Sequence, residues 1–454
     1  METTSAPCKI EVGEKGASEI SPLLFGYNVL YCIETAERWA DGFVPESLRQ
    51  AGATILRYPG GHVASFYHWK MPYYSFGQDG LDPAIQEQFD AEQLKKENAG
   101  HMDLDCYLDW CRKLNVEPML GINLLSGHRF NRLQEGIDEA IEMLAHCQEQ
   151  GTRIKYAFLD NEVGHRPADQ HVPAEKYPEY VQLYSKALKQ FDPDIQLICN
   201  YIGPVLSDNV KQLIREAGHD FAIYDYHWYY GTDGWGWFDR EKWLADDFSK
   251  QAGEFDAFYR FCEETGNTHL KLALLEWNLG PSLHGEKSAA IDQALVMSDM
   301  MMLFIKKNVH SACVWPLQWI SNVDSNVWRN TVDSRTRQRN AGWQMMHLFK
   351  DLCGQIQVPV QTDDKSVVAV AATSAEEDML VVYLLNKTQQ DGREAEIQLN
   401  DRRFKWAKAD MLVEKDFDTV EVKPANAATN NGNIQLRLQP LSVTRVCISL
   451  DTSA

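Results

Sequence analysis

The first part of the chain, from about residue 23 to residue 351, alternates short apolar runs with longer amphipathic segments. The apolar runs are almost continuous, which is typical of strands buried on both faces of a parallel sheet. In the longer segments apolar residues recur at i, i+3, i+4 and i+7, which predicts helices with one buried face. Strands are predicted in this way at 23–30, 53–59, 116–124, 154–160, 195–201, 221–228, 270–277 and 311–319. The clearest helices are predicted at 103–115, 136–151, 177–191, 255–266 and 291–308.

The alternation of eight strands with helices predicts a closed (β/α)8 barrel, because eight parallel strands complete such a barrel. The alternative is a doubly wound open sheet, which usually has a glycine-rich phosphate-binding turn after its first strand. The sequence at the end of the first predicted strand, YNVLYCIE, offers no such turn. We therefore predict an α/β protein with a catalytic (β/α)8 TIM barrel over residues 20–353.

After about residue 355 the pattern changes to alternating apolar and polar positions separated by turn residues. Strands are predicted here at 366–373, 379–386, 395–400, 434–440 and 442–450, and the Asn-rich and Ala-rich stretch 424–433 is predicted to be a loop. This pattern predicts a C-terminal antiparallel β-sandwich over residues 354–454. Within residues 1–19, the short run CKIEV is expected to join the sandwich, because a lone strand ahead of a barrel needs a partner.

Composition narrows the possible partners. The chain is 44% hydrophobic, with 13 Trp and 18 Tyr, and its formal net charge is −21. Such a charge argues against nucleic acid and against anionic membrane surfaces, which would repel it. No apolar stretch is long enough to cross a bilayer. Abundant aromatic side chains suit the faces of sugars, so an oligosaccharide or polysaccharide is the expected partner.

The ten cysteines are scattered singly, and no C-x-x-C motif occurs. They are expected to be buried free thiols, which favours a reducing compartment. The N-terminal sequence METTSAPCKIEV lacks the charged and apolar regions of a signal peptide. A cytoplasmic location is slightly favoured, and a periplasmic or secreted one stays open if a signal was removed.

Two glutamates stand at positions suited to chemistry. The reactive groups of an α/β barrel gather at the carboxyl ends of its strands, and Glu162 and Glu276 are the only glutamates at such ends, after the fourth and in the seventh predicted strand. Retaining glycoside hydrolysis needs two carboxyl groups about 5–5.5 Å apart. The two strands face each other across a barrel mouth of about 15 Å, so the side chains can meet. The alternative is a pair of structural carboxylates in ion pairs.

Five motifs along the chain resemble those of clan A retaining glycoside hydrolases, most closely family 51, the α-L-arabinofuranosidases. In order, they are ISPLLFGYN, LRYPGGHVASFYHWK, IKYAFLDNE, DYHWYY and LALLEWN. The resemblance implies a barrel followed by a β-sandwich and a two-glutamate double-displacement mechanism. It implies no cofactor and no metal, and it allows a homo-oligomer.

The resemblance also implies roles for individual residues. Glu162 would be the general acid/base and Glu276 the nucleophile. Asn161 would hydrogen-bond the sugar hydroxyl next to the anomeric carbon, a contact that strengthens as positive charge develops there.

Three further side chains are expected to support the two glutamates. Tyr229 would lie near Glu276 and keep it ionised and oriented. His227 would hold the acid/base region, and Arg57 would brace the nucleophile electrostatically. These neighbours would separate the pKa values of the two carboxyl groups, so that one donates a proton while the other attacks.

The sequence departs from the family pattern beside the predicted catalytic residues. His62 stands where the family has a sugar-contacting asparagine, and Leu30 stands where it has a glutamate. Asp160 replaces the glycine before Asn161, and Leu275 replaces the aspartate before Glu276. These departures predict that the mechanism is retained while the pocket for the glycone, the sugar that is transferred, is rebuilt.

Aromatic and amide residues near the last strands are further candidates. Gln318 aligns with a glutamine that contacts the glycone in relatives. Trp319 is predicted either to stack on a sugar or to pack in the core. The loop 229–239 is rich in aromatic residues and glycine, and Trp235 or Trp237 in it would form a wall for the substrate, unless the loop only packs on itself.

The predicted function is therefore retaining hydrolysis of glycosidic bonds, with terminal α-L-arabinofuranosides of plant or microbial polysaccharides as the default substrate. The alternatives are another glycone (hexose, xylose or galactofuranose), endo action on a polysaccharide, or capture of the intermediate by a second sugar. A non-catalytic carbohydrate-binding protein is a more remote alternative. A metal-dependent barrel hydrolase is disfavoured, because neither H-x-H nor H-E-x-x-H occurs.

Overall fold

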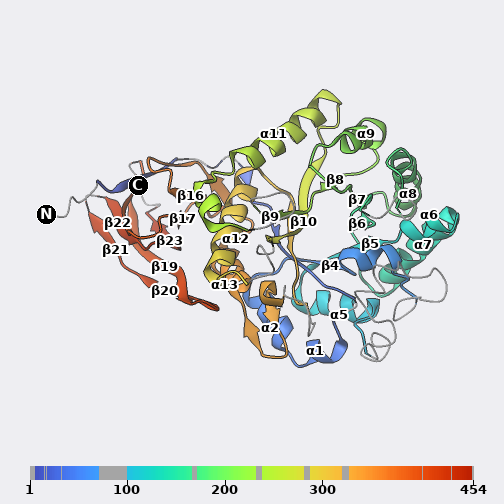
Figure 1. Ribbon diagram of the computed structural model, residues 1–454, viewed down its shortest axis with the longest axis horizontal. Helices are drawn as coiled ribbons and strands as arrows, with labels where there is room; N and C mark the ends of the chain where they lie inside the picture. Colours follow the sequence, from blue (N-terminus) through green and yellow to red (C-terminus); the bar gives the residue numbers. More distant parts are fainter. Residues whose placement is uncertain are drawn as a thin grey trace.

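The computed structural model describes residues 6–451 apart from residues 15, 17, 32, 71–99, 166–170, 232–237, 281–286, 320–326, 401 and 431. It consists of a barrel of parallel strands surrounded by helices, with two further sheets packed against one side of the barrel (Figure 1). Both chain termini lie on the side of these two sheets (Figure 1).

The barrel contains the eight predicted strands. They are β3 (Leu23–Asn28), β4 (Ile55–Tyr58), β5 (Glu117–Ile122), β6 (Tyr156–Leu159), β7 (Gln196–Asn200), β8 (Ile223–Asp225), β10 (Lys271–Leu279) and β11 (Ser311–Val314). Neighbours in this order pair in parallel, and β11 also pairs with β3, which closes the barrel. A short strand, β9 (Trp228–Tyr230), continues beside the end of β10. The predicted closed α/β barrel is therefore confirmed.

The helices cover the outside of the barrel. They are α1 (Ala36–Ala40), α2 (Phe43–Gln50), α5 (Leu104–Leu114), α6 (Leu125–Arg129), α7 (Leu133–Glu149), α8 (Tyr177–Phe191), α9 (Asp208–Ala217), α10 (Arg240–Ala245), α11 (Ser249–Glu264), α12 (Ala290–Lys306) and α13 (Ala341–Phe349). Three 3-10 turns, η1 (Gly61–Phe66), η3 (Val327–Arg329) and η4 (Lys350–Leu352), connect them. Helix α11 begins at Ser249, whereas residue 255 was predicted as its beginning. The first residues of the helix are polar and carry no apolar repeat, so the sequence pattern did not indicate them.

The inside of the barrel is filled by side chains and is not a channel. Ten buried residues form its core: Ile55, Ala64, Met119, Tyr156, Phe158, Ile198, Ile223, Ala273, Leu275 and Cys313. Nearly all of them come from the strands, and they alternate with residues that face the surrounding helices. Polar groups are thereby excluded from the centre of the barrel, so they gather at its ends.

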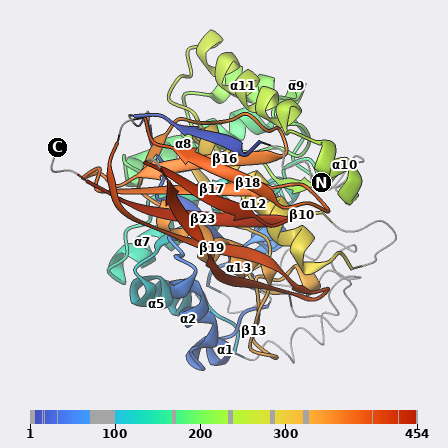
Figure 2. The same ribbon diagram turned by 90° about the vertical axis from the view of Figure 1, so that its left-hand side faces the viewer.

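The second part of the chain forms two sheets that face each other across a separate apolar core (Figure 2). One sheet has the order β15 (Val360–Thr362), β1 (Cys8–Val12), β18 (Arg393–Gln398), β22 (Asn433–Leu438) and β21 (Ala427–Asn430). The other has the order β2 (Ser18–Glu19), β14 (Ile356–Val358), β16 (Val367–Thr373), β17 (Met379–Asn386), β23 (Ser442–Leu450), β19 (Phe404–Asp416) and β20 (Thr419–Ala425). Strand β1 pairs with β15 and β18, so the first strand of the chain completes this sheet.

The two parts are joined through helices α12 and α13, which pack against the larger sheet. The hydroxyl of Tyr383 donates to the carbonyl oxygen of Leu348 over 2.7 Å. The ammonium of Lys387 lies 2.9 Å from Asp299, and both side chains are buried. A buried ion pair of this kind fixes the geometry of an interface more than it adds stability.

The prediction of a loop at 424–433 was wrong. This stretch contains the end of β20, all of β21 and the beginning of β22. Strand β21 lies at the edge of its sheet, and in the described part of the chain its one strand partner is β22. Small polar residues are tolerated there because an edge strand has one side open to solvent.

Two further predictions concern cysteine and membrane contact. The nine cysteines in the described part of the chain are free thiols, most of them buried. Among the described residues, no helix combines the length and the apolar character that crossing a membrane requires.

Candidate active site

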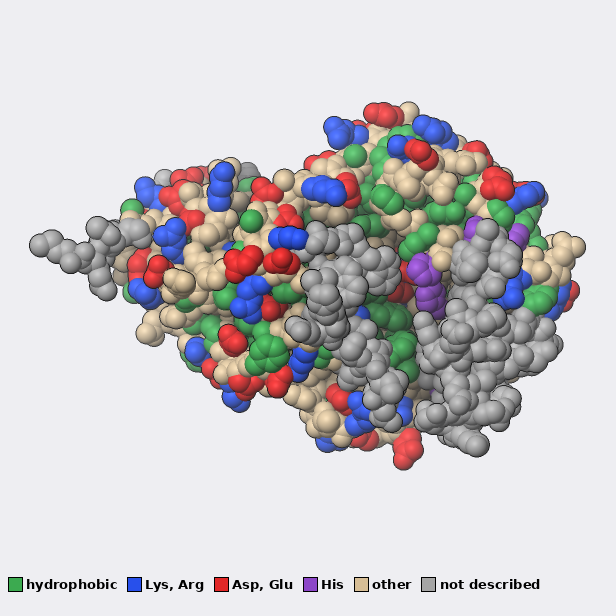
Figure 3. All heavy atoms as spheres, in the orientation of Figure 1, with side chains coloured by type: hydrophobic (Ala, Val, Ile, Leu, Met, Phe, Trp, Pro, Cys, Tyr) green, Lys and Arg blue, Asp and Glu red, His purple; other side chains and the backbone are tan. Residues whose placement is uncertain are grey.

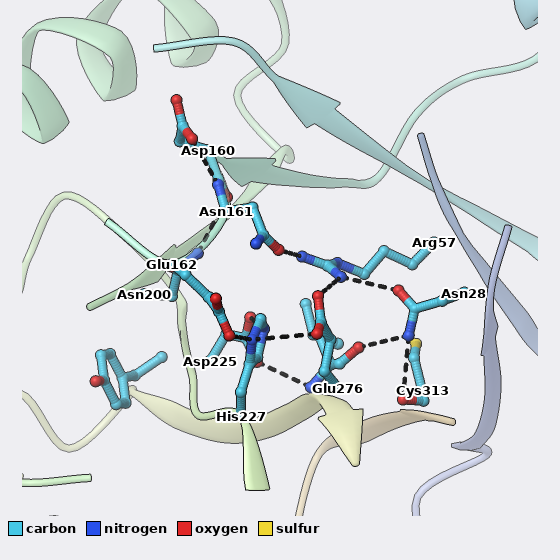
Figure 4. Close-up of polar contacts among 12 residues, drawn as sticks. Asn28, Arg57, Asp160, Asn161, Glu162, Asn200, Asp225, His227, Glu276 and Cys313 are labelled. Carbon is cyan, nitrogen blue, oxygen red and sulfur yellow. Dashed lines mark hydrogen bonds and ion pairs between the residues drawn. The ribbon is translucent and has the colours of Figure 1, made fainter. Parts of the chain in front are cut away.

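The two predicted catalytic glutamates meet at the carboxyl end of the barrel. Glu162 follows β6 directly and Glu276 lies within β10. One carboxylate oxygen of each, together with a ring nitrogen of His227, all lie within 4.8 Å of one another (Figure 4). Glu276 is 5% exposed, whereas the side chain of Glu162 is 14% exposed. The two carboxylates therefore face each other, with Glu162 on the more open side.

Arg57, at the end of β4, ties the strand ends of the site together. One guanidinium nitrogen donates to Glu276 over 2.9 Å and to the side-chain oxygen of Asn28 over 2.8 Å, and the other donates to Asn161 over 2.6 Å. The guanidinium is fully buried and lies 4.3 Å above the ring of Phe158. A buried charge needs such partners, and only a planar fork of donors reaches all of them.

Glu276 is held at both of its oxygens. Arg57 donates to Oε1, and the hydroxyl of Tyr229 donates to Oε2 over 2.8 Å. Burial, together with the negative charge of Glu276, raises the pKa of Tyr229 far above its ordinary value, so the hydroxyl keeps its proton and acts as a donor. Both donors fix the direction of the carboxylate.

Glu162 is linked to a histidine that an aspartate orients. The Nδ1 atom of His227 lies 2.9 Å from Oε1 of Glu162, and its Nε2 atom lies 3.0 Å from Asp225. Burial opposes a positive charge on His227, but Glu276, Asp225 and Glu162 raise its pKa to about 10. Burial likewise opposes ionisation of Glu162, yet the hydrogen bond and charge of His227 bring its pKa well below the usual range. Without substrate, the proton of this pair therefore resides on His227.

The backbone that presents Asn161 and Glu162 is unusual. Asp160 has φ of +65° and Glu162 has φ of +48°, in the left-handed region that side chains with a Cβ atom rarely adopt. The carboxylate of Asp160 offsets this strain. It accepts from the amides of Leu124 (3.0 Å), Leu125 (2.7 Å) and Asn161 (2.7 Å), and from the hydroxyl of Ser65. Asp160 stands where the family has a glycine, and its carboxylate satisfies these buried donors.

His62 lies on the open side of Glu162. It follows Gly60 and Gly61, which both have positive φ, and a Cβ atom on Gly61 would come within 2.4 Å of the ring of Trp315. The Nε2 atom of His62 is 3.7 Å from Oε2 of Glu162. The position that is an asparagine in the family thus places an imidazole beside the predicted acid/base.

The other predicted site residues lie at varying distances from this centre. Gln318 is fully buried and its amide is engaged by protein, donating to Glu34 over 2.7 Å and accepting from the amide of Ser334. Trp319 is half-buried, with its ring 6.2 Å from that of Trp315. Trp235 and Trp237 lie outside the described residues.

Sequence reasoning missed several residues that shape the site: Asn28, Glu34, Asp225 and His165. Asn28 and Asp225 are the last residues of β3 and β8, so a search of all strand ends for Asn and Asp would have found both. His165 lies three residues after Glu162, and the amide of His165 donates to the carbonyl oxygen of Glu162 over 2.9 Å, which turns its ring back toward that carboxylate. No simple pattern marks Glu34, which lies in a connection after β3.

A cavity of about 550 Å³ opens beside this centre. Glu162, His227 and Tyr229 form one end of it, while Tyr226, Trp228 and Phe248 supply aromatic walls. Residues from the beginning of α11, among them Gln251, also line it. Among the described residues, Glu276 does not line this cavity, so the space lies on the Glu162 side of the carboxylate pair.

Comparison with known proteins agrees with this geometry. The family model of the α-L-arabinofuranosidase 1 domain matches residues 47–260. The chain is 28% identical over 183 residues to α-L-arabinofuranosidase C of Emericella nidulans. This aligned region covers 36% of this chain and 33% of that protein. The chain is 24% identical over 288 residues to an intracellular exo-α-(1→5)-L-arabinofuranosidase of Acetivibrio thermocellus. This aligned region covers 56% of this chain and 52% of that protein. The chain thus spans between a third and about half of the length of these two relatives.

A solved structure is also similar to this chain in its fold. The crystal structure of an α-L-arabinofuranosidase from Thermotoga maritima in complex with arabinose superposes with a TM-score of 0.76 at 18% identity, covering 98% of this chain and 100% of that one. The chain therefore shares the barrel fold of these glycoside hydrolases. The predicted resemblance to clan A glycoside hydrolases, most closely to family 51, is confirmed.

Proposed function

We propose that this protein is a retaining glycoside hydrolase in which Glu276 is the nucleophile and Glu162 the general acid/base. The observation that carries the proposal is the approach of the two carboxylates, whose oxygens lie within 4.8 Å of each other. Retaining enzymes hold their two carboxyl groups about 5–5.5 Å apart, whereas inverting enzymes leave about 6.5–9.5 Å for a water molecule. The spacing here suits direct attack on the sugar.

In the first step Glu276 attacks the anomeric carbon and forms a covalent glycosyl ester, while Glu162 protonates the departing oxygen. Arg57 and Tyr229 fix the attacking carboxylate, which keeps the cost of reorganisation low. In the second step Glu162, now ionised, removes a proton from water, and the water oxygen releases the sugar from Glu276.

The proton for the first step comes from the pair formed by Glu162 and His227. It moves over the 2.9 Å between Nδ1 and Oε1 when a bound sugar displaces water from the site. Asp225 holds the opposite ring nitrogen, so the imidazole stays aligned throughout. The pair thereby supplies an acid in one step and a base in the next.

Asn161 recognises the sugar next to the anomeric carbon. Arg57 already donates to its side-chain oxygen over 2.6 Å, so its NH2 group is the part that donates to the sugar hydroxyl. This bond strengthens as the ring gains positive charge in the transition state.

The leaving group occupies the cavity on the Glu162 side. General acid catalysis requires the leaving oxygen to lie next to Glu162, and the 550 Å³ space begins there. Aromatic walls suit the apolar faces of a saccharide. Gln251→Ala should therefore raise KM for oligosaccharides several-fold while leaving small aryl glycosides unaffected.

Terminal α-L-arabinofuranosides are the proposed substrate, supported by the names of the relatives. His62 and Leu30 favour the alternative of a different glycone, because both occupy positions where the family has sugar-contacting polar groups. Leu30 is only 1% exposed, so it removes a polar contact without adding a new one.

The test is hydrolysis of a panel of nitrophenyl glycosides. We expect wild-type turnover of at least one furanoside, and a loss of at least about 10⁴-fold in Glu276→Gln, because no covalent intermediate forms. Glu162→Ala should lose much less on nitrophenyl substrates, whose leaving groups need little protonation, than on alkyl glycosides. Glu216→Gln, at an exposed glutamate of α9, is the matched control. Sugar binding without turnover by wild type on every substrate would contradict the proposal.

A further inference from the structure

Two histidines and a glutamate converge outside the carboxylate pair. The Oε2 atom of Glu162 lies 3.7 Å from Nε2 of His62 and 3.8 Å from Nδ1 of His165. The three atoms all lie within 4.8 Å of one another, and the two imidazole rings are 5.1 Å apart. This face of Glu162 is distinct from the Oε1 atom that His227 holds.

These distances are close to those of a coordination site. Zinc binds imidazole nitrogen and carboxylate oxygen at about 2.0–2.2 Å, so neighbouring ligand atoms in a tetrahedral site are about 3.3–3.6 Å apart. Two of the separations here exceed that range by only a few tenths of an ångström. Two histidines and one glutamate form a ligand set that proteins use for zinc with an open fourth position.

The chain holds these ligands in place from several sides. A backbone hydrogen bond of 2.9 Å from the amide of His165 to the carbonyl oxygen of Glu162 closes the turn between them. His227 and Asp225 orient the Glu162 carboxylate from behind, as second-layer partners do for metal ligands. Both histidine side chains are more than a third exposed, so an ion reaches them from solvent. Histidine side chains are visible at the surface on this face of the barrel (Figure 3).

The neighbouring group of Glu162, His227 and Glu276 is less suited to a metal. His227 is enclosed by three carboxylates that stabilise its protonated form, and a metal ligand must be a neutral imidazole. His62 and His165 share the carboxylate of Glu162, at 3.7 and 3.8 Å.

We propose that His62, Glu162 and His165 form a binding site for a divalent transition metal ion of the zinc type, and that the bound ion reversibly switches off proton transfer by Glu162. The first half stands on the ligand geometry alone. The second half rests on the proposed function, because a carboxylate that coordinates a metal neither donates a proton to a leaving group nor accepts one from water. The net charge of −21 raises the local concentration of cations.

The first experiment measures Zn²⁺ binding to the untagged, chelator-treated full-length protein by calorimetry. We expect one ion per chain, with an affinity that falls as the pH is lowered because protons compete for the histidines. His165→Asn and His62→Asn should each weaken binding at least tenfold. His269→Asn, at an exposed histidine before β10, is the matched control and should bind as wild type does. Absent binding, or equal binding by all four proteins, overturns the site.

The second experiment measures glycoside hydrolysis with added Zn²⁺ and with a chelator, at a fixed pH. Inhibition should follow occupancy, be reversed by the chelator, and require at least tenfold more Zn²⁺ in His165→Asn than in wild type. Zn²⁺ binding at this site with full activity overturns the switch. Zn²⁺ binding without turnover on any glycoside, with or without the chelator, overturns the proposed function and with it the switch, while the binding site stands.

Discussion

The Nδ1 atom of His227 lies 2.9 Å from Oε1 of Glu162, and this contact sets the protonation state of the predicted acid/base. His227 carries the proton while the site is empty, because the carboxylates around it raise its pKa to about 10. In the proposed mechanism, Glu162 therefore acts as an acid only through this neighbour. We accordingly expect residues that contact His227 to govern the pH dependence of the reaction.

Asp225→Asn should shift the pH dependence of kcat/KM. Asp225 is one of the carboxylates that raise the pKa of His227, so removing its charge lowers that pKa. The basic limb of the profile, where the pair loses its proton, should move to lower pH by about one unit or more. A basic limb at the same pH in Asp225→Asn and wild type would contradict this coupling. Glu254→Gln, at another residue that lines the cavity, should leave the limb in place.

Tyr229→Phe should reduce kcat/KM by about tenfold to a hundredfold. The change removes the only hydroxyl that donates to Oε2 of Glu276 among the described residues, and a hydrogen bond to a charged group contributes about 1.5–3 kcal/mol. The enzyme should keep its fold, because the ring itself still packs. Steady-state kinetics on the best nitrophenyl substrate, with a thermal melt of both proteins, gives the answer. Unchanged kinetics would mean that Arg57 alone positions Glu276, the proposed nucleophile.

Asp160→Asn should lower the free energy of unfolding by about 2–4 kcal/mol. Asparagine tolerates the positive φ, so strain does not change. Its NH2 group, however, would face donors that the carboxylate now accepts from, such as the amides of Leu124 and Leu125, and each unpaired buried donor costs about 1–3 kcal/mol. Urea unfolding measures the loss. Asn131→Gly, at an exposed residue with φ of +53°, is the control and should change stability by less than about 1 kcal/mol. Equal stability of Asp160→Asn and wild type would show that backbone strain, not pairing, governs this turn.

Glu34→Gln should stabilise the protein at pH 8 but not at pH 4.5. Burial raises the pKa of Glu34 from 4.5 to about 7, although bonds from Trp39 and Gln318 partly oppose this. The folded state therefore favours the protonated form. The stability that this form contributes is complete below about pH 4.5 and is lost as the pH rises through 7.

A glutamine at position 34 does not titrate, and its oxygen accepts the same two hydrogen bonds. The difference in the free energy of unfolding between Glu34→Gln and wild type should therefore grow, in favour of the variant, by about 3 kcal/mol between pH 4.5 and pH 8. Denaturant unfolding at several pH values measures this difference. The same difference at both ends of the range would show that folding does not change the pKa of Glu34.

The regular pattern of the chain was sufficient to predict the barrel. Strands such as β6 and β7 are buried on both faces, so their hydrophobic runs stand out from the amphipathic helices between them. The edge strand β21 was mistaken for a loop because an exposed edge does not need apolar residues. The start of α11 was missed for a similar reason, since its first turn has no buried face.

The site was predictable only in part. Glu162, Glu276 and Arg57 lie at strand ends, where the topology alone gathers polar groups, and the structure brings all three together. Gln318, by contrast, has both ends of its amide engaged by Glu34 and Ser334, two partners that no local pattern connects to it. Glu34 lies 284 positions from Gln318, and a contact over such a separation leaves no trace in the periodicity of either segment.

The sequence by itself therefore determined the order of strands and helices and placed two glutamates at the carboxyl ends of the fourth and seventh barrel strands. Periodicity encodes which face of each element is buried, and that is enough to define a barrel. Only the tertiary structure decided that Arg57 bridges Glu276 and Asn161, that Asp225 holds His227, and that two histidines enclose the outer face of Glu162. The reason is physical: closing the barrel brings together strand ends that are far apart along the chain, and distances between side chains exist only after that closure.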